Sequence, residues 1–468
     1  MHATSTTAAI PLVRSARTLA LLQAPIPGLL LRLAGPNVLV MLAQASTGLI
    51  EAHFIGRLGT PALAGMALAG MALVFPGLML MQMMSAGAMG GGISSAIARA
   101  LGAGRRADAD VLALHALAVS AGLGAAFCAA GLLGGPALYR AMGGSGAALG
   151  AALQYSNVVF AGAILLWVFN GLASCIRGTG DMLWPAAVIT GGAAVLVPLS
   201  PCLIFGWGPF PALGVAGGGV ALLLYYAIGA AVFLVRLCRA GAGAGVRLRL
   251  HRLRLAPLWA ILRVGLVASL VTVQTNLVVT LTTAYAGRFG AAAIAGYGAA
   301  TRLEFLLVPL VFGLGAPLVA AVGTNIGAGQ HARALRVAWT GAGAAFVMTE
   351  AIGLCAAAWP GAWLGWFGQD PAMLDAGAAY LRTAGPFFGF FGGGMALYFA
   401  SQGAGRLAWP LAAAMLRMAA AVGGGWLALQ LGGSLPLVFL ASGAGLLILG
   451  VVNAASMAGG ARFREGRA

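Results

Sequence analysis

The chain contains no lysine and few charged residues of either sign. Only 7% of its 468 residues are charged, nine of them acidic, while 61% are hydrophobic. A soluble globule needs more polar residues to cover its surface, so the composition excludes a soluble protein and indicates a lipid bilayer as the solvent. Without lysine the sequence G-x-x-x-x-G-K-[ST] cannot occur, which excludes an ATP-driven pump of that kind.

Motifs of enzymes and metal sites are missing as well. The sequence has no HExxH motif, no Ser-His-Asp pattern and no paired spacing among its five cysteines. The cysteines fall in apolar stretches or at their ends, which argues against disulfides and structural metals. We therefore expect no enzyme, no bound metal and no cofactor.

Long apolar stretches are what the sequence has in abundance. About twelve of them are roughly 20 residues long, enough to cross a bilayer core of about 30 Å as a helix. They start near residues 33, 61, 109, 151, 184, 213, 258, 291, 337, 377, 408 and 434. The predicted fold class is therefore all-α, a polytopic membrane protein of about twelve helices.

Two segments of the chain recur at a constant distance. Residues 101–105 (LGAGR) match residues 326–330 (IGAGQ), and residues 178–185 (GTGDMLWP) match residues 403–410 (GAGRLAWP). Both matches lie 225 positions apart, from 102 to 327 and from 178 to 403. Repeats in so apolar a chain are how secondary transporters build two lobes around a central site.

A third match lies upstream and has a different offset. Residues 56–59 (GRLG) match residues 287–290 (GRFG), 231 positions later, so the first copy holds six additional residues, which we place within residues 79–92. Six crossings per copy is an even number, so both copies enter the membrane from the same side. The two predicted lobes are parallel, related by an axis along the membrane normal.

All basic residues are arginines, and the net charge is +17. In a soluble protein this charge would indicate nucleic-acid binding, but here the arginines gather in alternate loops, most densely between residues 236 and 263. By the positive-inside rule, both termini and the central loop are cytoplasmic. The expected segments are a tail at 1–25, a first lobe at 26–236, a basic linker at 237–256, a second lobe at 257–458 and a tail at 459–468.

Three carboxylates fall inside the predicted spans: Glu51, Glu304 and Glu350. Such a group costs about 2.5 to 3.5 kcal/mol at the bilayer centre, so each needs a partner, water or a proton. Glu350 has few polar neighbours on its helix, and a role at a helix end or between helices is as well supported as one in transport.

Glu51 belongs to a polar stripe along the first span. Asn37, Gln44 and Glu51 are spaced by seven, with Thr47 between them, so they share one helical face. A polar stripe facing lipid would be unfavourable, so we expect it to line the lobe interior or a central cavity. Two roles for Glu51 are then open. It gains and loses a proton as its side chain becomes accessible from one side of the membrane and then the other, or it is a protonated acid that forms hydrogen bonds to a neighbouring helix.

Glu304 shares a helical face with Tyr297 and Thr301. Arg302 is close in sequence but points elsewhere around the helix, so a direct pair with Glu304 is awkward and each residue needs another partner. A coupling role and a structural ion network are both open here.

In the first lobe, Arg177 and Asp181 flank a glycine turn and are expected to form a surface pair.

Several of these segments resemble one known family. Residues 51–64 (EAHFIGRLGTPALA), 98–104 (ARALGAG), 177–181 (RGTGD), 322–329 (VGTNIGAG) and 296–304 (GYGAATRLE) resemble the multidrug and toxic compound extrusion (MATE) family of the MOP superfamily. The resemblance covers about residues 26–458. It implies two six-helix lobes that form a V and export organic cations and related drugs in exchange for protons or sodium.

The sequence also departs from the family's pattern. The first-helix acid of the family is usually Asp, and Glu51 stands in its place. The Asn and Asp that many bacterial members have in the fifth helix are replaced by Leu196 and Ser200, before Pro201. Where one branch carries a Glu in the seventh helix, this chain has residues 274–276 (QTN).

We expect Glu51 and Glu304 to couple a cation to transport. The residues expected to line the substrate cavity are polar or aromatic and lie on the first, seventh and eighth spans; they are Asn37, Gln44, Thr47, Gln274, Asn276, Tyr297, Thr301 and Arg302. Protons are favoured over sodium because a sodium site wants several oxygen ligands.

The sequence thus predicts a monomeric multidrug antiporter of the bacterial inner membrane. Its partners would be small organic molecules and the lipid bilayer, with no nucleic acid. Three alternatives stay open: a sodium-coupled exporter, a lipid-linked oligosaccharide flippase and an uncoupled channel-like protein. A flippase would need several arginines in its cavity to bind phosphate. We expect Arg302 to be the only arginine in the central part of the membrane spans.

Overall fold

The computed structural model of the chain describes residues 15–55, 57–58, 61–239 and 245–458. The side chains of residues 45–52, 61–64 and 305 lie outside this description, and so do the predicted tail at 459–468 and most of the one at 1–25. Every regular element within the described ranges is a helix. The all-α prediction is confirmed.

The first lobe follows a short helix, α1 (Ala16–Gln23). Its elements are α2 (Ile26–Ile55), α3 (Pro61–Gln82), the π-helix η1 (Met83–Met89), α4 (Gly90–Gly102), α5 (Arg106–Ala141), α6 (Gly146–Ala161), α7 (Ala163–Arg177), α8 (Leu183–Phe205) and α9 (Val215–Arg239). The helix η1 lies in the stretch where the six additional residues were expected, and π-helical turns inside α-helices are rare and often lie at functional sites.

The second lobe repeats this plan. Its elements are α10 (Leu255–Gly287), α11 (Ala291–Gly327), α12 (His331–Ala358), α13 (Pro360–Leu364), α14 (Pro371–Ala384), the 3-10 helix η2 (Gly385–Phe387), α15 (Phe388–Ala404), α16 (Ala408–Met418), the π-helix η3 (Ala419–Gly423), α17 (Gly424–Gln430) and α18 (Leu435–Ala458). Helices α12, α14, α15 and α16 begin 225 positions after α5, α6, α7 and α8, at 331, 371, 388 and 408 against 106, 146, 163 and 183.

Most of the predicted membrane crossings are single long helices. Ten spans in the described residues are long and apolar enough to cross a bilayer, and the pair α6 and α7, bent by 47°, makes an eleventh. The segment α14–η2–α15 occupies the same place in the second lobe as α6 and α7 in the first. With it, each lobe has six crossings.

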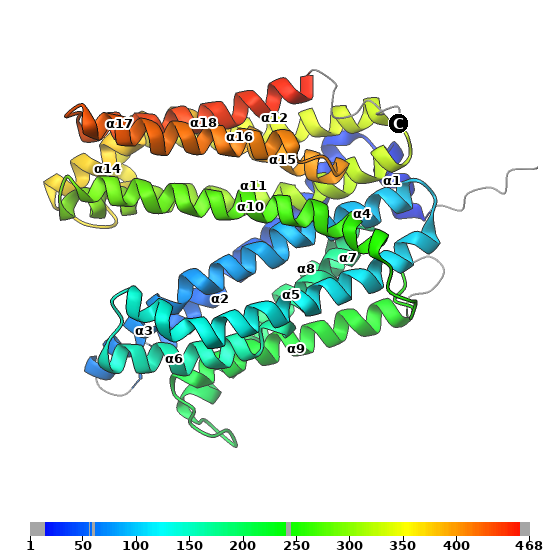
Figure 1. The fold of residues 1–468 in the computed structure, drawn as a ribbon, viewed down its shortest axis with the longest axis horizontal. Helices are drawn as coiled ribbons and strands as arrows, with labels where there is room; N and C mark the ends of the chain where they lie inside the picture. The colour runs from blue at the N-terminus through cyan, green and yellow to red at the C-terminus, as the bar shows by residue number, and fades with distance from the viewer. Residues whose placement is uncertain (1–14, 56, 59–60, 240–244, 459–468) are drawn as a thin grey trace, which may run out of the picture.

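The two lobes form a V (Figure 1). They meet at the end where α4 packs against α11 and α15, which we call the closed end. At the opposite, open end, α3 and α6 lie apart from α14 and α17 (Figure 1). Buried apolar residues of the described chain fall into two clusters that largely follow the lobes. Each lobe therefore has its own core, and the contacts between lobes reach from the closed end to about the middle of α11.

Exposed tryptophans occur near both ends of the helices. Trp side chains concentrate at the two surfaces of a bilayer, where the ring is half apolar and half hydrated. Those near the open end include Trp207, Trp359, Trp366 and Trp426, and those near the closed end include Trp184, Trp259 and Trp409. Their positions mark where the bilayer surfaces cross the V, with the lobes diverging through the membrane.

Candidate functional site

The lobes meet at the closed end through the repeated glycines. A Cβ atom on Gly102 would lie far inside van der Waals contact of the Thr324 carbonyl oxygen, and one on Gly327 would meet the Arg99 carbonyl oxygen in the same way. Gly102 with Gly327, and Arg99 with Thr324, are both 225 positions apart. The repeated Gly-Ala-Gly element is thus a symmetric close crossing of α4 and α11, which we call the glycine seam.

Hydrogen bonds reinforce the seam. Arg99 Nη1 donates to the Gly403 carbonyl at 3.0 Å, and Ser95 Oγ donates to the same oxygen at 3.3 Å. From the other lobe, Gln402 Nε2 donates to the carbonyls of Gly87 and Ala88, at 3.3 and 3.1 Å. These two carbonyls belong to the π-helix η1, so the altered backbone of the first lobe is bonded to a side chain of the second.

Asn37 also lies between the lobes. It is 3% exposed, and its Nδ2 donates to the carbonyls of Phe312 and Gly313 on α11, at 3.1 and 3.0 Å. Pro317 has no N–H, so the Gly313 carbonyl lacks its partner within the helix. The Asn37 amide supplies that partner from the other lobe.

Replacing Asn37 by Leu is expected to weaken the contact between lobes by about 1 to 2 kcal/mol, because two hydrogen bonds are lost and the Gly313 carbonyl is left buried and unpaired. Thermal unfolding of the purified protein in detergent measures the change. The matched control is Asn276→Leu, because the exposed Asn276 amide bonds only within its own helix, to the Thr272 carbonyl at 2.9 Å. Equal loss in both variants would contradict this role for Asn37.

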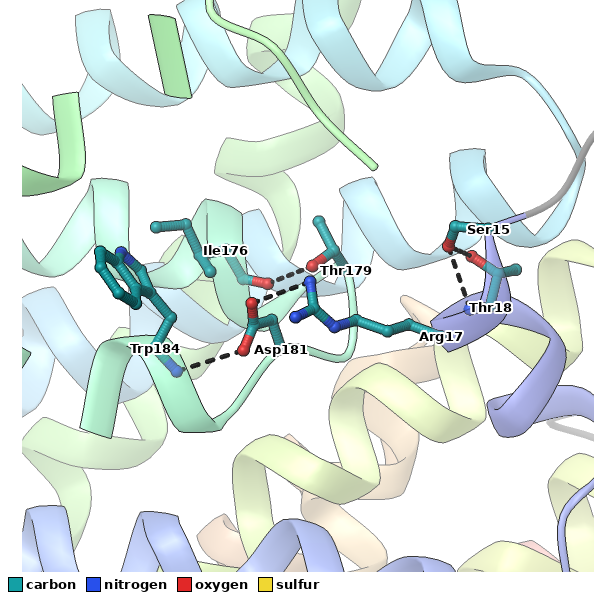
Figure 2. Close-up of polar contacts among 7 residues, drawn as sticks. All are labelled: Ser15, Arg17, Thr18, Ile176, Thr179, Asp181 and Trp184. Carbon is teal, nitrogen blue, oxygen red and sulfur yellow. Dashed lines mark hydrogen bonds and ion pairs between the residues drawn. The ribbon is translucent and has the colours of Figure 1, made fainter. Parts of the chain in front are cut away.

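The first short helix is tied to the first lobe by an ion pair. Figure 2 shows Arg17 of α1 reaching Asp181, with 2.9 Å between Arg17 Nη1 and Asp181 Oδ2. The other carboxylate oxygen, Oδ1, accepts from the Trp184 N–H at 3.1 Å, at the start of α8. The predicted surface pair of Arg177 and Asp181 is wrong: both residues are buried, and the Asp181 carboxylate pairs with Arg17, more than 160 positions earlier.

The same helix is bonded to the second lobe. Asn325 Nδ2 donates to the Leu21 carbonyl at 3.1 Å, Arg333 Nε donates to it at 3.5 Å, and Arg333 Nη2 donates to the Ala24 carbonyl. Leu21 is 2% exposed and belongs to the core of the second lobe. The C-terminal part of the predicted tail at 1–25 is therefore an ordered helix that bridges both lobes at the closed end.

Glu304 lies inside the second lobe, where three helices meet. Its Oε2 accepts from the Tyr380 hydroxyl of α14 at 2.7 Å, and its Oε1 lies 3.9 Å from Nη2 of Arg417 on α16. Arg417 is 5% exposed and Glu304 14%. We call this group the carboxylate site. Arg302, in contrast, is exposed and stands over the Phe367 ring at 5.0 Å, so Glu304 and Arg302 have separate partners, as their spacing predicted.

Aromatic rings enclose the carboxylate site. Tyr297 stacks on Phe439 with 5.4 Å between ring centroids, and Tyr380 stands edge-on to both rings at 5.1 and 5.3 Å. Arg417 also lies over the Phe391 ring at 5.8 Å. In this apolar surrounding the charges of Glu304 and Arg417 depend on each other, because removing one leaves the other buried and uncompensated.

Arg417 was missed by the sequence reasoning. The expectation that central arginines reduce to Arg302 is wrong, since Arg417 is the one that is buried, within the span formed by residues 408–430. The available signal was a single arginine in the middle of an otherwise apolar stretch. Because it points into its own lobe against Glu304, it does not add a phosphate site between the lobes.

Glu350 has a role at a helix end. Its Oε2 accepts from the Gly389 N–H at 2.6 Å, in the first turn of α15. This turn follows the break at η2, where N–H groups have no partner within the helix. A carboxylate there also interacts favourably with the helix dipole. Of the two roles proposed for Glu350, this geometry favours the one at a helix end.

The remaining predicted site residues are not gathered in one place. Thr47 and Glu51 lie on α2, but their side chains are outside the described residues; Gln44 is half-buried. Gln274 is 4% exposed on α10, and the Thr301 hydroxyl donates within its own helix, to the Tyr297 carbonyl at 3.0 Å.

Asn276 lies elsewhere on α10. Gly265 faces the first lobe, because a Cβ atom added to it would meet Met89. Asn276 follows Gly265 by eleven positions, which is about three helical turns and returns to the same face of α10. Asn276 therefore lies on the α10 face that is turned toward the first lobe.

The described part of the basic linker, from residue 245 on, lies against α5, which the sequence reasoning did not foresee. The Arg247 N–H donates to Asp110 Oδ1 at 2.7 Å, and the Arg254 N–H donates to His115 Nε2 at 2.8 Å. Since His115 Nδ1 lies 2.8 Å from the Val111 carbonyl, it donates there, and Nε2 accepts. The described part of the linker is thus attached to the first lobe.

Comparison with known proteins gives the family. The family model described as MatE matches residues 36–202 and 266–427. A protein named FAD transporter from Shewanella oneidensis is 30% identical over 317 residues, covering 67% of this chain and 68% of its own. A probable multidrug resistance protein NorM from Deinococcus radiodurans is 31% identical over 337 residues, covering 69% and 70%.

Solved structures agree in fold. A crystal structure of MATE in the bent conformation has a TM-score of 0.86 and 24% identity, covering 96% of this chain and 99% of its own. An outward-facing conformation of a multidrug resistance MATE family transporter of the MOP superfamily has a TM-score of 0.83 and 23% identity. With a family model that matches most of the sequence, the chain belongs to the MatE family of multidrug efflux transporters.

Proposed function

We propose that the protein exports small organic compounds, often cationic, in exchange for protons, by alternating access of its two lobes. The observation that carries this proposal is the glycine seam. It joins two similar lobes at one end only and uses the same contact from each repeat, so rocking of the lobes about an axis in the membrane plane can exchange the closed and the open end.

The arginine distribution orients this cycle. The described part of the linker and the turns from α4 to α5 and from α15 to α16, which hold Arg105 and Arg406, lie at the closed end. By the positive-inside rule, we assign the closed end to the cytoplasm, so that the described conformation opens to the outside of a bacterial plasma membrane. In this orientation a substrate would leave from the open end, and reloading would require the glycine seam and the α1 contacts to separate.

For the coupling we assign the first role to Glu51 and a second to Glu304. Protonation of Glu51 would neutralise it, repack α2 and drive substrate off toward the outside, and release of the proton to the cytoplasm would reset the site. At Glu304 a proton is favoured over sodium, because a sodium ion wants several oxygen ligands and the neighbours of this carboxylate are the Tyr380 hydroxyl and the Arg417 guanidinium.

One relative supports a second candidate for the substrate. The protein from Shewanella oneidensis is named FAD transporter, and FAD carries two phosphates and is anionic. A protein that binds such an anionic dinucleotide needs different side chains in its binding site from one that binds a lipophilic cation. The transport assay therefore includes both classes of substrate.

The test is transport in proteoliposomes under an imposed gradient of protons or of sodium. The native protein is expected to move ethidium against its own gradient when protons flow the other way, and Glu51→Gln is expected to lose at least tenfold of this activity. Asp108→Asn is the control, since Asp108 is an exposed carboxylate paired with Arg105 at 3.4 Å.

Other outcomes would overturn separate parts of the proposal. Full exchange by Glu51→Gln would remove Glu51 from the coupling, and exchange driven by sodium alone would overturn the choice of ion. Movement of ethidium only down its gradient would indicate an uncoupled protein. Uptake of FAD in place of ethidium would replace the cationic substrate class with an anionic dinucleotide.

A further inference from the structure

A groove with two arginines, Arg333 and Arg336, lies at the closed end, beside the contacts of α1. It runs between the connection from α1 to α2 and the first half of α12. Pro25 and Pro27 line one side, and Arg333, Arg336, Trp339 and Thr340 line the other. No acidic side chain is among the described residues that line it.

The helical spacing explains why two like charges stand together. Arg333, Arg336 and Thr340 follow each other at intervals of three and four, so their side chains share one face of α12. Two guanidinium groups at such a spacing repel each other, and an anion between them removes the repulsion. The Thr340 hydroxyl donates to the Arg336 carbonyl at 2.8 Å, which keeps this turn regular.

Arg333 is already fixed in place. Its Nε and Nη2 donate to the carbonyls of Leu21 and Ala24, which positions the guanidinium at the edge of the groove. A guanidinium has five N–H donors in a planar fork, so further donors remain for a ligand. Arg336 is exposed and supplies a second cation one turn away.

The rest of the groove is apolar. Pro25, Ile26, Pro27 and Leu335 surround the arginines, and Trp339 is 39% exposed at the same level. A ligand that satisfies both parts must carry an anionic group and an apolar chain. Tryptophans near this end mark the surface of the bilayer, where anionic phospholipids offer phosphate and acyl chain together.

We propose that this groove binds an anionic phospholipid of the bilayer, with its phosphate between Arg333 and Arg336 and an acyl chain along Trp339 and the prolines. Since Arg333 also holds the end of α1, a bound lipid stabilises the attachment of α1 to the second lobe. Basic pockets beside membrane helices are a recurrent kind of site for anionic headgroups.

The test compares lipids added to the purified protein in detergent, with the thermal unfolding midpoint and native mass spectrometry as readouts. Phosphatidylglycerol is expected to raise the midpoint and to remain bound, while phosphatidylcholine does neither. Arg336→Gln is expected to lower the apparent affinity for phosphatidylglycerol about tenfold. Arg382→Gln, which removes an exposed arginine on α14, is expected to leave this affinity unchanged.

Three results would overturn the proposal. The first is equal stabilisation by phosphatidylglycerol and phosphatidylcholine. The second is an affinity of Arg336→Gln equal to that of Arg382→Gln. The third is full stabilisation by inorganic phosphate alone, which would assign the two arginines to a free anion. None of these results depends on whether the protein exchanges protons for drugs.

Discussion

Alanine at Gly102 or at Gly327 is expected to open the closed end and to reduce transport by tenfold or more. In each case the new Cβ meets a backbone carbonyl of the other lobe, Thr324 for Gly102 and Arg99 for Gly327. A backbone atom cannot rotate away as a side chain does, so the helices must separate. Overpacking of this kind costs about 1 to 3 kcal/mol, and the upper value corresponds to a roughly hundredfold shift in population.

Two other glycines provide the control for this prediction. Gly122 and Gly343 lie inside helices, and a Cβ at either would meet nothing within 4 Å. By helix propensity alone, alanine in place of Gly122 or Gly343 stabilises the helix by up to about 1 kcal/mol, and the same change at Gly102 or Gly327, the last residues of α4 and α11, is expected to destabilise neither helix. The seam predicts a loss at Gly102 and Gly327 only, measured as efflux from vesicles containing equal amounts of inserted protein. Equal activity in all four variants would contradict the seam.

Loss of one partner of the carboxylate site is expected to destabilise the second lobe by about 3 kcal/mol. Arg417→Met removes the cation and leaves Glu304 facing aromatic rings, whereas Glu304→Gln leaves Arg417 buried without a counter-charge. The cost arises from the unpaired charge more than from the lost attraction. The double variant Glu304→Gln with Arg417→Met has no charge left and is expected to recover most of the stability.

Unfolding midpoints of the two single variants and the double variant, in the same detergent, measure this coupling. If the double variant is destabilised by the sum of the single effects, the two charges do not depend on each other. Transport by the double variant gives a separate result. A stable but inactive double variant would indicate that Glu304 also takes part in the coupling to the ion.

The architecture could be predicted from the sequence because it follows from composition and repetition. Apolar stretches gave the spans, and the offset of 225 between Gly102 and Gly327 gave two similar lobes. The structure adds that the same offset relates the two sides of the contact between α4 and α11. Gly102 meets the backbone at Thr324, three positions before Gly327, and Gly327 meets the backbone at Arg99, three positions before Gly102. A repeat alone cannot show this, because it carries no information on distances between copies.

The partners of the charged groups could not be predicted, because they are distant in sequence. Asp181 was assigned to Arg177 by proximity, but it pairs with Arg17. Glu304 meets Tyr380 and Arg417, which lie 76 and 113 positions further along the chain. Helical spacing predicts which residues share a face of one helix; it does not predict which other helix packs against that face.

The central claim, that the two ends open in alternation, is tested most directly by distances between spin labels. One pair replaces Arg105 and Gln330 at the closed end and the other replaces Arg57 and Arg288 at the open end, in a variant without the five native cysteines. On changing from acidic to alkaline pH, the distance between 105 and 330 should lengthen and that between 57 and 288 should shorten, while Glu51→Gln keeps the acidic distances. Distances that stay fixed, or that change in the same direction at both ends, would contradict the account.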